Sequence, residues 1–243
     1  MTEHTAPPAA ASDPAPERPR SRQRSALLFL RDVVVIVAAA LIISFLIKTF
    51  LIRSFYIPSE SMESTLLVND RIIVNQLVPD LVEVERGDVI VFRDPGSWLT
   101  PAPEQPRSPL EEGIDTVLTL VGLSASDSDE HLVKRVIGLP GDRIVCCNDL
   151  GQLSINGVPL DEPYVVLPEG RVDVSGSDFQ QDIPAGQLWV MGDNRYDSSD
   201  SRVNGPVPID DVVGRAFVVS WPIERWGWLD NYPLVFDGVD PRP

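Results

Sequence analysis

The sequence predicts a mainly β domain, built as an antiparallel β-sheet or a barrel-like fold, behind a single N-terminal transmembrane helix. The first observation is a long apolar run near the start of the chain, residues 33–52. The second is that the chain beyond this run consists of short apolar stretches separated by turn residues, which is typical of strands. The third is the dipeptide Asn156-Gly157 between two such stretches, a strong signal for a β-hairpin with a type I′ turn.

The N-terminal part divides around the apolar run. Residues 1–25 are rich in Ala, Pro and Glu and then in Arg. They have little to bury, so we expect a disordered tail. Residues 26–52 are the predicted anchor, because a membrane-spanning helix needs about 20 apolar residues. Arginines cluster on the N-terminal side, which predicts a cytoplasmic tail and places residues 53–243 outside.

Two other interpretations of the apolar run are weaker. A cleaved secretory signal usually has a shorter apolar region followed by a small-x-small cleavage site, and none is obvious here. A buried core helix is usually apolar on one face, whereas this run is apolar all round. Lys48 near one end does not exclude the anchor, because its amine can extend to the interface.

The candidate strands follow the anchor in order. They are residues 71–77, 88–92, 132–137, 143–147, 152–155, 158–160, 188–191 and 213–220. Between the second and third lies a loop-like insertion, residues 94–130, rich in Pro, Ser and acidic residues. Its apolar stretch 116–123 could be a short surface helix that packs on the domain or contacts lipid, and we favour packing.

Charge and cysteine content exclude several classes of function. The net charge of −16 argues against a nucleic-acid partner, which requires a basic face, and fits a role in solubility. The two cysteines, Cys146 and Cys147, are adjacent and cannot build a metal site with several thiolates. Neighbours on a strand point to opposite faces, so we favour unbridged thiols. An oxidising exterior leaves a vicinal disulfide open.

A serine-rich stretch, residues 57–66, follows the anchor and raises the question of a base. A serine becomes a nucleophile only when another group accepts its proton. The chain has two lysines and two histidines. Two of these four lie in the tail or the anchor, which leaves His131 and Lys134.

The strand predicted over 132–137 favours Lys134 as the base. Alternation places Leu132, Lys134 and Val136 on one face and His131 on the other. Burial among apolar neighbours would lower the pKa of the lysine amine. The alternative is a lysine at a strand edge with its amine in water, which is common because lysines are rarely buried.

Four stretches in this order behind an anchor resemble the bacterial type I signal peptidases. They are residues 57–66, 86–92, 133–142 and 192–202. The members of that family are Ser-Lys proteases of the plasma membrane that remove signal peptides from exported preproteins after Ala-x-Ala sites.

The resemblance assigns roles to individual residues. Ser61 matches the nucleophile and Lys134 the base. Ser59 matches the donor that, with the backbone N–H of Ser61, stabilises the oxyanion, and Ser198 matches the serine that orients the lysine amine.

The resemblance also implies supporting residues. Asp200 and Arg202 match a structural ion pair, although they could be a simple surface pair. Asp193 and Arg195 match the fixed opening of their stretch, although Asp193-Asn194 could be only a turn. The implied substrate-binding residues are Ile57, Pro58, Met62 and Leu66.

This sequence departs from the family pattern at two places. Glu60 stands where many members have Gly, and we expect little effect. His131 and Leu132 stand where many members have Asp-Tyr, so the wall of the substrate cleft is expected to differ in shape.

No second apolar run of spanning length follows the first, so we expect a single-pass protein. The resemblance implies an endopeptidase with no metal or organic cofactor, whose partners are preproteins and the lipid bilayer, and we expect it to be monomeric. One alternative is a catalytically silent, membrane-tethered β-domain that binds exported proteins. Another is a self-cleaving Ser-Lys protein of the repressor type. Such proteins are soluble and bind DNA, which the anchor and the acidic charge disfavour.

Overall fold

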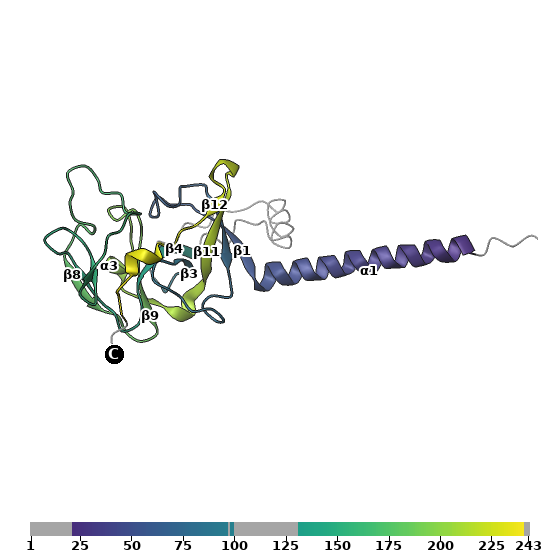
Figure 1. Cartoon of the computed structure of the whole chain (residues 1–243), viewed down its shortest axis with the longest axis horizontal. Helices are drawn as coiled ribbons and strands as arrows, with labels where there is room; N and C mark the ends of the chain where they lie inside the picture. Colours follow the sequence, from purple (N-terminus) through teal and green to yellow (C-terminus); the bar gives the residue numbers. More distant parts are fainter. Residues whose placement is uncertain (1–20, 97, 100–130, 241–243) are drawn as a thin grey trace, which may run out of the picture. The chain divides into compact units, whose positions relative to one another are not determined.

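The computed structural model describes residues 21–96, 98–99 and 131–240 (Figure 1). Most of the predicted insertion 94–130, including the proposed short helix 116–123, and most of the predicted tail lie outside the described residues. The chain divides into two compact units, residues 1–45 and 46–243, and each is described by itself.

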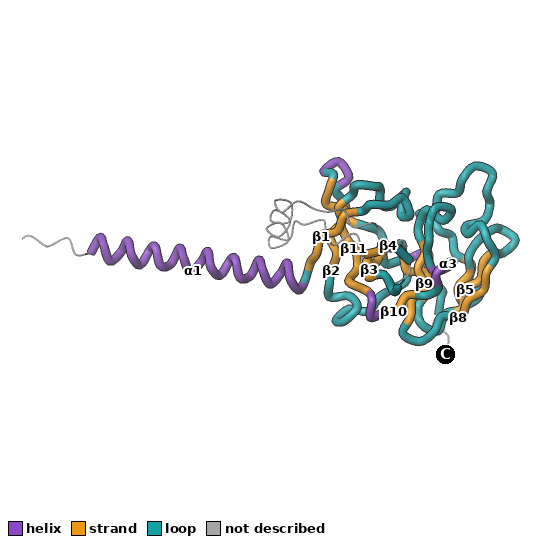
Figure 2. The backbone as a smooth tube through the Cα atoms, turned by 180° about the vertical axis from the view of Figure 1, so that it is seen from behind, coloured by secondary structure: helices purple, strands orange, loops and turns teal. Residues whose placement is uncertain are grey.

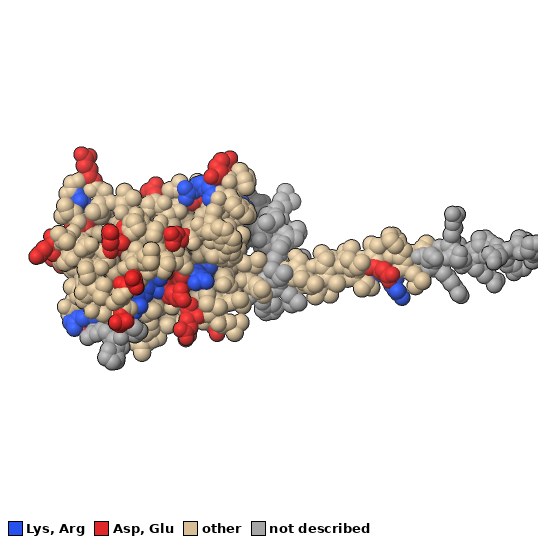
Figure 3. Space-filling model, viewed as in Figure 1, with Lys and Arg blue, Asp and Glu red and all other residues tan. Residues whose placement is uncertain are grey.

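The first unit contains most of helix α1, Ser21–Phe50. The segment Ala26–Phe45 is long and apolar enough to cross a membrane, and its side chains are exposed. In the described part of the chain it is the one helix that meets this criterion. Arg31 and Asp32 form an exposed ion pair on this helix. Figure 3 shows one group of charged atoms on the helix, and its other described atoms belong to uncharged residues. A single N-terminal apolar helix was predicted, and it begins five residues earlier than the predicted anchor.

The second unit is mainly β, as predicted, and every strand pair in it is antiparallel. An eight-stranded sheet has the order β1-β2-β11-β3-β4-β9-β10, with β12 paired to β11 (Figure 2). Its strands are β1 (Ile52–Tyr56), β2 (Arg71–Asn75), β3 (Val89–Arg93), β4 (His131–Gly138), β9 (Gln187–Met191), β10 (Val207–Pro208), β11 (Val212–Trp221) and β12 (Gly227–Trp228). The short helix α3, Ser201–Asn204, lies between β9 and β10 in sequence.

A second sheet has four strands in the order β7-β6-β5-β8. They are β5 (Arg143–Cys146), β6 (Ser154–Ile155), β7 (Val158–Pro159) and β8 (Phe179–Asp182). Asn156 and Gly157 join β6 to β7 with φ values of 53° and 88°. Positive φ at both central residues is what a type I′ turn requires, so the predicted hairpin is confirmed.

Four strands escaped the sequence analysis. β10 and β12 have two residues each, too few to show alternation. The sequence of β8 is Phe-Gln-Gln-Asp, which lacks an apolar pattern. β1 begins at Ile52, the last residue of the predicted anchor, and the short stretch after it was not recognised as a strand.

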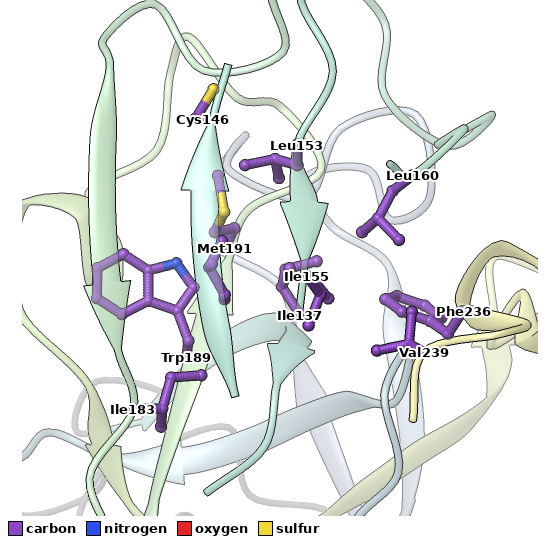
Figure 4. Close-up of a cluster of buried hydrophobic side chains, with 11 residues drawn as sticks. Ile137, Cys146, Leu153, Ile155, Leu160, Ile183, Trp189, Met191, Phe236 and Val239 are labelled. Carbon is purple, nitrogen blue, oxygen red and sulfur yellow. The ribbon is translucent and has the colours of Figure 1, made fainter. Parts of the chain in front are cut away.

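Apolar side chains fill three clusters within the second unit. One lies under β1, β2, β3 and β11, and a second lies around β3, β9 and β10. The third joins the two sheets (Figure 4): Ile137 and Met191 of the large sheet pack with Ile155 of the small sheet. Gly138 allows this close contact, because a Cβ atom there would lie 2.7 Å from Cδ1 of Ile144. The small sheet is therefore held on the large one by a shared core.

The preference for unbridged thiols is wrong. Cys146 and Cys147 form a disulfide across a cis peptide bond. The expectation of opposite faces required both residues to lie on a strand, but β5 ends at Cys146. Cys146 itself belongs to the shared core between the sheets (Figure 4).

Candidate active site

The serine-rich stretch forms a series of turns between β1 and β2. Two backbone hydrogen bonds of 2.9 Å hold its start, from the N–H of Ile57 to Asp70 O and from the N–H of Asn69 to Ile57 O. Ile57, Met62 and Leu66 are 2%, 1% and 0% exposed. These apolar side chains fix the stretch to the core because their removal from water is favourable.

The predicted base meets the predicted nucleophile in this structure. Lys134 lies in β4, opposite Ile90 of β3, and is 3% exposed. Its Nζ donates a hydrogen bond of 2.6 Å to Oγ of Ser61, which is 8% exposed. The alternative of a lysine with its amine in water is therefore excluded.

Burial lowers the pKa of the Lys134 amine, which makes the amine a better candidate for a base near neutral pH. Removal from water, with a smaller contribution from the positive charge of Arg202, lowers this pKa from 10.5 to about 8. The negative charges of Asp200 and Asp193 act in the opposite direction but are outweighed. An amine with a pKa near the working pH can accept a proton from a hydroxyl within hydrogen-bond distance.

Two further serines lie near this pair. Oγ of Ser59 is 3.3 Å from Oγ of Ser61. The hydroxyl of Ser198 donates a 2.8 Å hydrogen bond to Oδ2 of Asp200. Among the described residues the Lys134 amine is hydrogen bonded to Ser61 and not to Ser198. An orienting role for Ser198 would therefore act through Asp200.

Asp200 and Arg202 form a largely buried ion pair, not a surface pair. Nε and NH2 of Arg202 each donate a 2.8 Å hydrogen bond to the Asp200 carboxylate, and the exposed fractions of the two side chains are 8% and 0%. Burial raises the pKa of Asp200, but the hydrogen bonds and charge of Arg202 outweigh it and hold this pKa below its usual value. Arg202 also donates to the carbonyl oxygens of Arg195 and Ser175 at 2.6 and 2.7 Å.

Asp193 is more than a turn residue, because it pairs with Arg135 in the interior. Nε and NH2 of Arg135 donate to its two carboxylate oxygens at 2.9 and 2.8 Å. Thr65 donates a third hydrogen bond of 2.5 Å to the same carboxylate. Both ion-pair side chains are 0% exposed. This pair joins the serine-rich stretch, β4 and the 192–202 stretch.

Comparisons with known proteins show the family to which this chain belongs. Residues 30–221 match the family model described as signal peptidase, peptidase S26. The chain belongs to this family. Signal peptidase I of Mycobacterium tuberculosis is 37% identical over 234 residues, covering 87% of this chain and 78% of the relative. Signal peptidase I U of Bacillus subtilis is 34% identical over 193 residues, covering 77% of this chain and 84% of the relative.

A probable signal peptidase I of Mycobacterium leprae is 38% identical over 204 residues, covering 72% of this chain and 70% of the relative. A solved signal peptidase I structure from Enterococcus faecalis matches with a TM-score of 0.37 at 25% identity, covering 54% of this chain and 95% of that chain. The prediction of a signal peptidase, a hydrolase, is confirmed by the family match and the relatives. With the apolar helix α1, the family indicates a membrane-anchored enzyme.

The residues that the signal peptidase resemblance implied for substrate binding lie in two environments. Pro58 is exposed beside the serines. Ile57, Met62 and Leu66 are buried core residues, and their contact with substrate stays a prediction. His131 packs against Phe55 with a ring-centroid distance of 5.2 Å. Its role in the cleft wall stays a prediction.

Sequence reasoning missed several residues that surround the dyad. Arg135, Thr65, Glu162 and Tyr164 are hydrogen bonded to the predicted site residues or to one another. A charged residue inside an apolar strand is a signal that could have identified Arg135, because a buried charge needs a partner. Nothing in the sequence marks Glu162, which lies 33 residues from the arginine that it binds.

Gly192 is tightly enclosed and gives a prediction. A Cβ atom there would overlap the carbonyl oxygen of Ser61 and lie 2.6 Å from Cβ of Ser198. We expect Gly192→Ala to displace the Ser61 backbone and to lower kcat by about 100-fold or more, as small displacements at active sites do. Preprotein cleavage under single-turnover conditions measures this.

The matched control is Gly227→Ala in β12. A Cβ atom there would meet only the carbonyl oxygen of Arg225, at 3.8 Å, which is ordinary contact. This variant should cleave at the wild-type rate. Equal activity of the two variants would contradict the expected effect at Gly192.

Proposed function

We propose that this chain is a membrane-anchored serine endopeptidase that removes signal peptides from exported preproteins after Ala-x-Ala sites. The observation that carries the proposal is the 2.6 Å hydrogen bond between the buried amine of Lys134 and the hydroxyl of Ser61. Arginine cannot act as a base, and the only other lysine of the chain, Lys48, belongs to α1.

The proposed reaction has two stages. In the first, neutral Lys134 takes the proton of Ser61 Oγ while this oxygen attacks the peptide carbonyl. The Ser59 hydroxyl and the Ser61 N–H donate to the developing oxyanion. Lys134 then gives the proton to the leaving amine, and an ester to Ser61 remains. In the second stage, Lys134 takes a proton from water as the water oxygen attacks this ester. Lys134 then gives this proton to Ser61 Oγ as the bond between that oxygen and the carbonyl carbon breaks, which releases the new carboxyl end.

The lowered pKa of Lys134 makes the first stage accessible near neutral pH. With a pKa of about 8, about one molecule in ten has a neutral amine at pH 7. With the ordinary value of 10.5, this fraction would be about one in three thousand. The predicted base is therefore about 300-fold more available than an exposed lysine.

The pairing of β4 supports an extended substrate. β3 pairs with β4 from His131 to Arg135, whereas β9 pairs with it only from Arg135 onward. Among the described residues, no strand pairs with the β9-side edge of Leu132 and Val133, next to Lys134, and we propose that a peptide adds there as a strand. Residues two apart on such a peptide face the same way, which fits recognition of the two alanines of Ala-x-Ala.

The arrangement in the membrane is part of the proposal. Residues 1–25 form a cytoplasmic tail, 26–52 a single-pass anchor and 53–243 an extracytoplasmic domain. The arginines before the anchor support this orientation, because cytoplasmic flanks carry excess positive charge. The enzyme acts as a monomer at the lipid surface of the bacterial plasma membrane, where the substrates emerge.

Cleavage of an Ala-x-Ala preprotein by the detergent-solubilised full chain tests the proposal. We expect wild type to cut after the second small residue, as N-terminal sequencing of the product would show. Ser61→Ala should lower kcat by roughly 10³ to 10⁶-fold, because nucleophile and base act as a unit. Wild type that binds several preproteins without cutting them, or unaltered activity of Ser61→Ala, would favour the catalytically silent tethered domain.

A further inference from the structure

The segment from Glu162 to Tyr164, between β7 and β8, lies outside the four stretches that carry the family resemblance. It nevertheless contacts three of them. Glu162 and Tyr164 are 8% and 3% exposed, so an acidic group and a phenol are buried together. Burial of such groups is costly unless their hydrogen bonds are satisfied, which makes their partners informative.

The first contact is with the serine-rich stretch. The hydroxyl of Ser64 donates a 2.6 Å hydrogen bond to the carbonyl oxygen of Tyr164. Ser64 lies three residues after Ser61 and has a φ of 88°, a backbone conformation that residues other than glycine rarely adopt. Such a conformation persists only where its surroundings enforce it. The bond to Tyr164 is one contact that does so.

The second contact is with the lysine strand. The guanidinium carbon of Arg135 lies 4.2 Å from the centroid of the Tyr164 ring and 5.2 Å from that of Tyr232. A cation over an aromatic face is attracted to it, most strongly where water is excluded. Arg135 follows Lys134 in β4, so Tyr164 packs against this strand at the residue next to the proposed base.

The third contact is with the 192–202 stretch. NH1 and NH2 of Arg195 donate to the two carboxylate oxygens of Glu162 at 3.0 and 2.5 Å. The hydroxyl of Tyr164 donates to Glu162 at 2.7 Å. Nε of Arg195 donates to the carbonyl oxygen of Gly192 at 3.0 Å. Glu162 therefore holds the glycine that packs on the Ser61 carbonyl.

We propose that Glu162 and Tyr164 are positioning residues that clamp together the serine-rich stretch, β4 and the 192–202 stretch. This inference rests on the proposed function. The clamp keeps Ser61 Oγ within hydrogen-bond distance of Lys134 Nζ and keeps water away from the amine. Neither residue touches Ser61 or Lys134, so both act through Ser64, Arg135 and Arg195.

The test measures the titration of the Lys134 amine by NMR in the variants Glu162→Gln and Tyr164→Phe. The chain has two lysines, so lysine labelled with ¹³C at Cε gives two NMR signals, and Lys48→Arg assigns them. Glu162→Gln places an amide against Arg195 and breaks the two-pronged contact. Tyr164→Phe keeps the ring and the carbonyl oxygen and removes only one hydroxyl, so it is expected to fold.

A loosened clamp admits water to the amine. Because burial is the largest cause of the lowered pKa, Lys134 should titrate at least about half a unit above its wild-type value of about 8 in Glu162→Gln, and in the same direction in Tyr164→Phe. The acid limb of kcat/KM should move with it. For Glu162→Gln, kcat per folded enzyme should fall about tenfold or more with KM within about twofold.

A purely structural role would lower the folded fraction and leave the titration in place. Ile155→Val, which removes one buried methyl group from the shared core, is the matched control and should leave both the NMR titration and the acid limb at the wild-type position. An unchanged Lys134 titration in folded Glu162→Gln, or in Tyr164→Phe if the first variant does not fold, would overturn the clamp.

Coupling between variants gives a second test. Ser64 and Glu162 are each hydrogen bonded to Tyr164, so the variants Ser64→Ala and Glu162→Gln change two residues that this tyrosine connects. A clamp predicts that the double variant loses less activity than the product of the two single losses. Independent effects would contradict it. If wild type cleaves no preprotein, the proposed function fails, but the NMR titration still decides whether Glu162 and Tyr164 set the state of Lys134.

Discussion

Replacement of Lys134 by methionine is expected to lower kcat by about 10⁴-fold or more. Methionine has a similar length and no charge, and the site is buried beside apolar residues of β3, so the variant should fold. In the described part of the chain, it leaves Ser61 hydrogen bonded to the Ser59 hydroxyl and to no basic group. Single-turnover cleavage of an Ala-x-Ala preprotein measures the loss, and a thermal melt reports whether the fold is kept.

Two lysine-to-arginine variants separate basicity from charge. Lys134→Arg keeps a positive charge in β4, but a guanidinium does not lose its proton in proteins, so cleavage should be lost as completely as in the methionine variant. Lys48→Arg makes the same exchange in α1 and should leave cleavage unchanged. Cleavage retained by Lys134→Met would remove this residue from the mechanism and leave His131 as the base to be tested.

The pH dependence of wild type distinguishes the same two bases. The amine must be neutral to accept a proton, so kcat/KM should rise with pH through the pKa of Lys134, about 8, and level off above it. A histidine base would give a rise near its ordinary pKa of about 6.5 instead. In Lys134→Met, kcat/KM for the residual activity should no longer rise with pH around 8.

Local patterns in the sequence predicted the strands that have enough residues to show them. Turn residues and alternation located β2, β3, β4, β9 and β11 within a few positions. The order of the sheet could not be predicted, because it depends on long-range pairing: β11, near the C-terminus, lies between β2 and β3. Arg225, which follows β11, then donates a 3.2 Å hydrogen bond to the carbonyl oxygen of Thr65 in the serine-rich stretch.

The site residues likewise divide into those that could be predicted from the sequence and those that could not. Alternation placed Lys134 on the apolar face of its strand, and the structure buries it there. The resemblance supplied Ser59, Ser61 and Ser198, whose roles stay predictions. Partners of buried charges could not be predicted. Asp193 is 58 residues from the arginine that it binds, and no local pattern encodes such a pair.

The interior pair of Asp193 and Arg135 gives the second large effect. Asp193→Ala is expected to lower the free energy of unfolding by about 3–5 kcal/mol, because Arg135 would stay buried without its carboxylate. Denaturant unfolding of the full chain in detergent measures this from the shift in midpoint at constant slope. Activity should fall as well, since Thr65 loses its acceptor on the same carboxylate.

An exposed pair in the same unit provides the control. Arg143 and Asp182 are 3.8 Å apart, with side chains 39% and 63% exposed. Asp182→Ala should cost less than about 1 kcal/mol, because water already solvates both charges. A loss at Asp193 as small as that would mean that Arg135 finds another partner or water.

The double variant Asp193→Ala, Arg135→Met tests the physical reason for the loss. If the cost comes from the unpaired guanidinium, removing that guanidinium should recover much of the stability, since an apolar pair can replace a buried ion pair at little cost. Cleavage should not recover, because the hydrogen bonds from Thr65 to Asp193 and from Arg135 to the carbonyl oxygen of Gly87 are also gone. Stability and activity would then separate. That result would show that the ion pair serves the alignment of the serine-rich stretch with β4 more than it serves the fold, whereas parallel recovery of both would assign it to the fold alone.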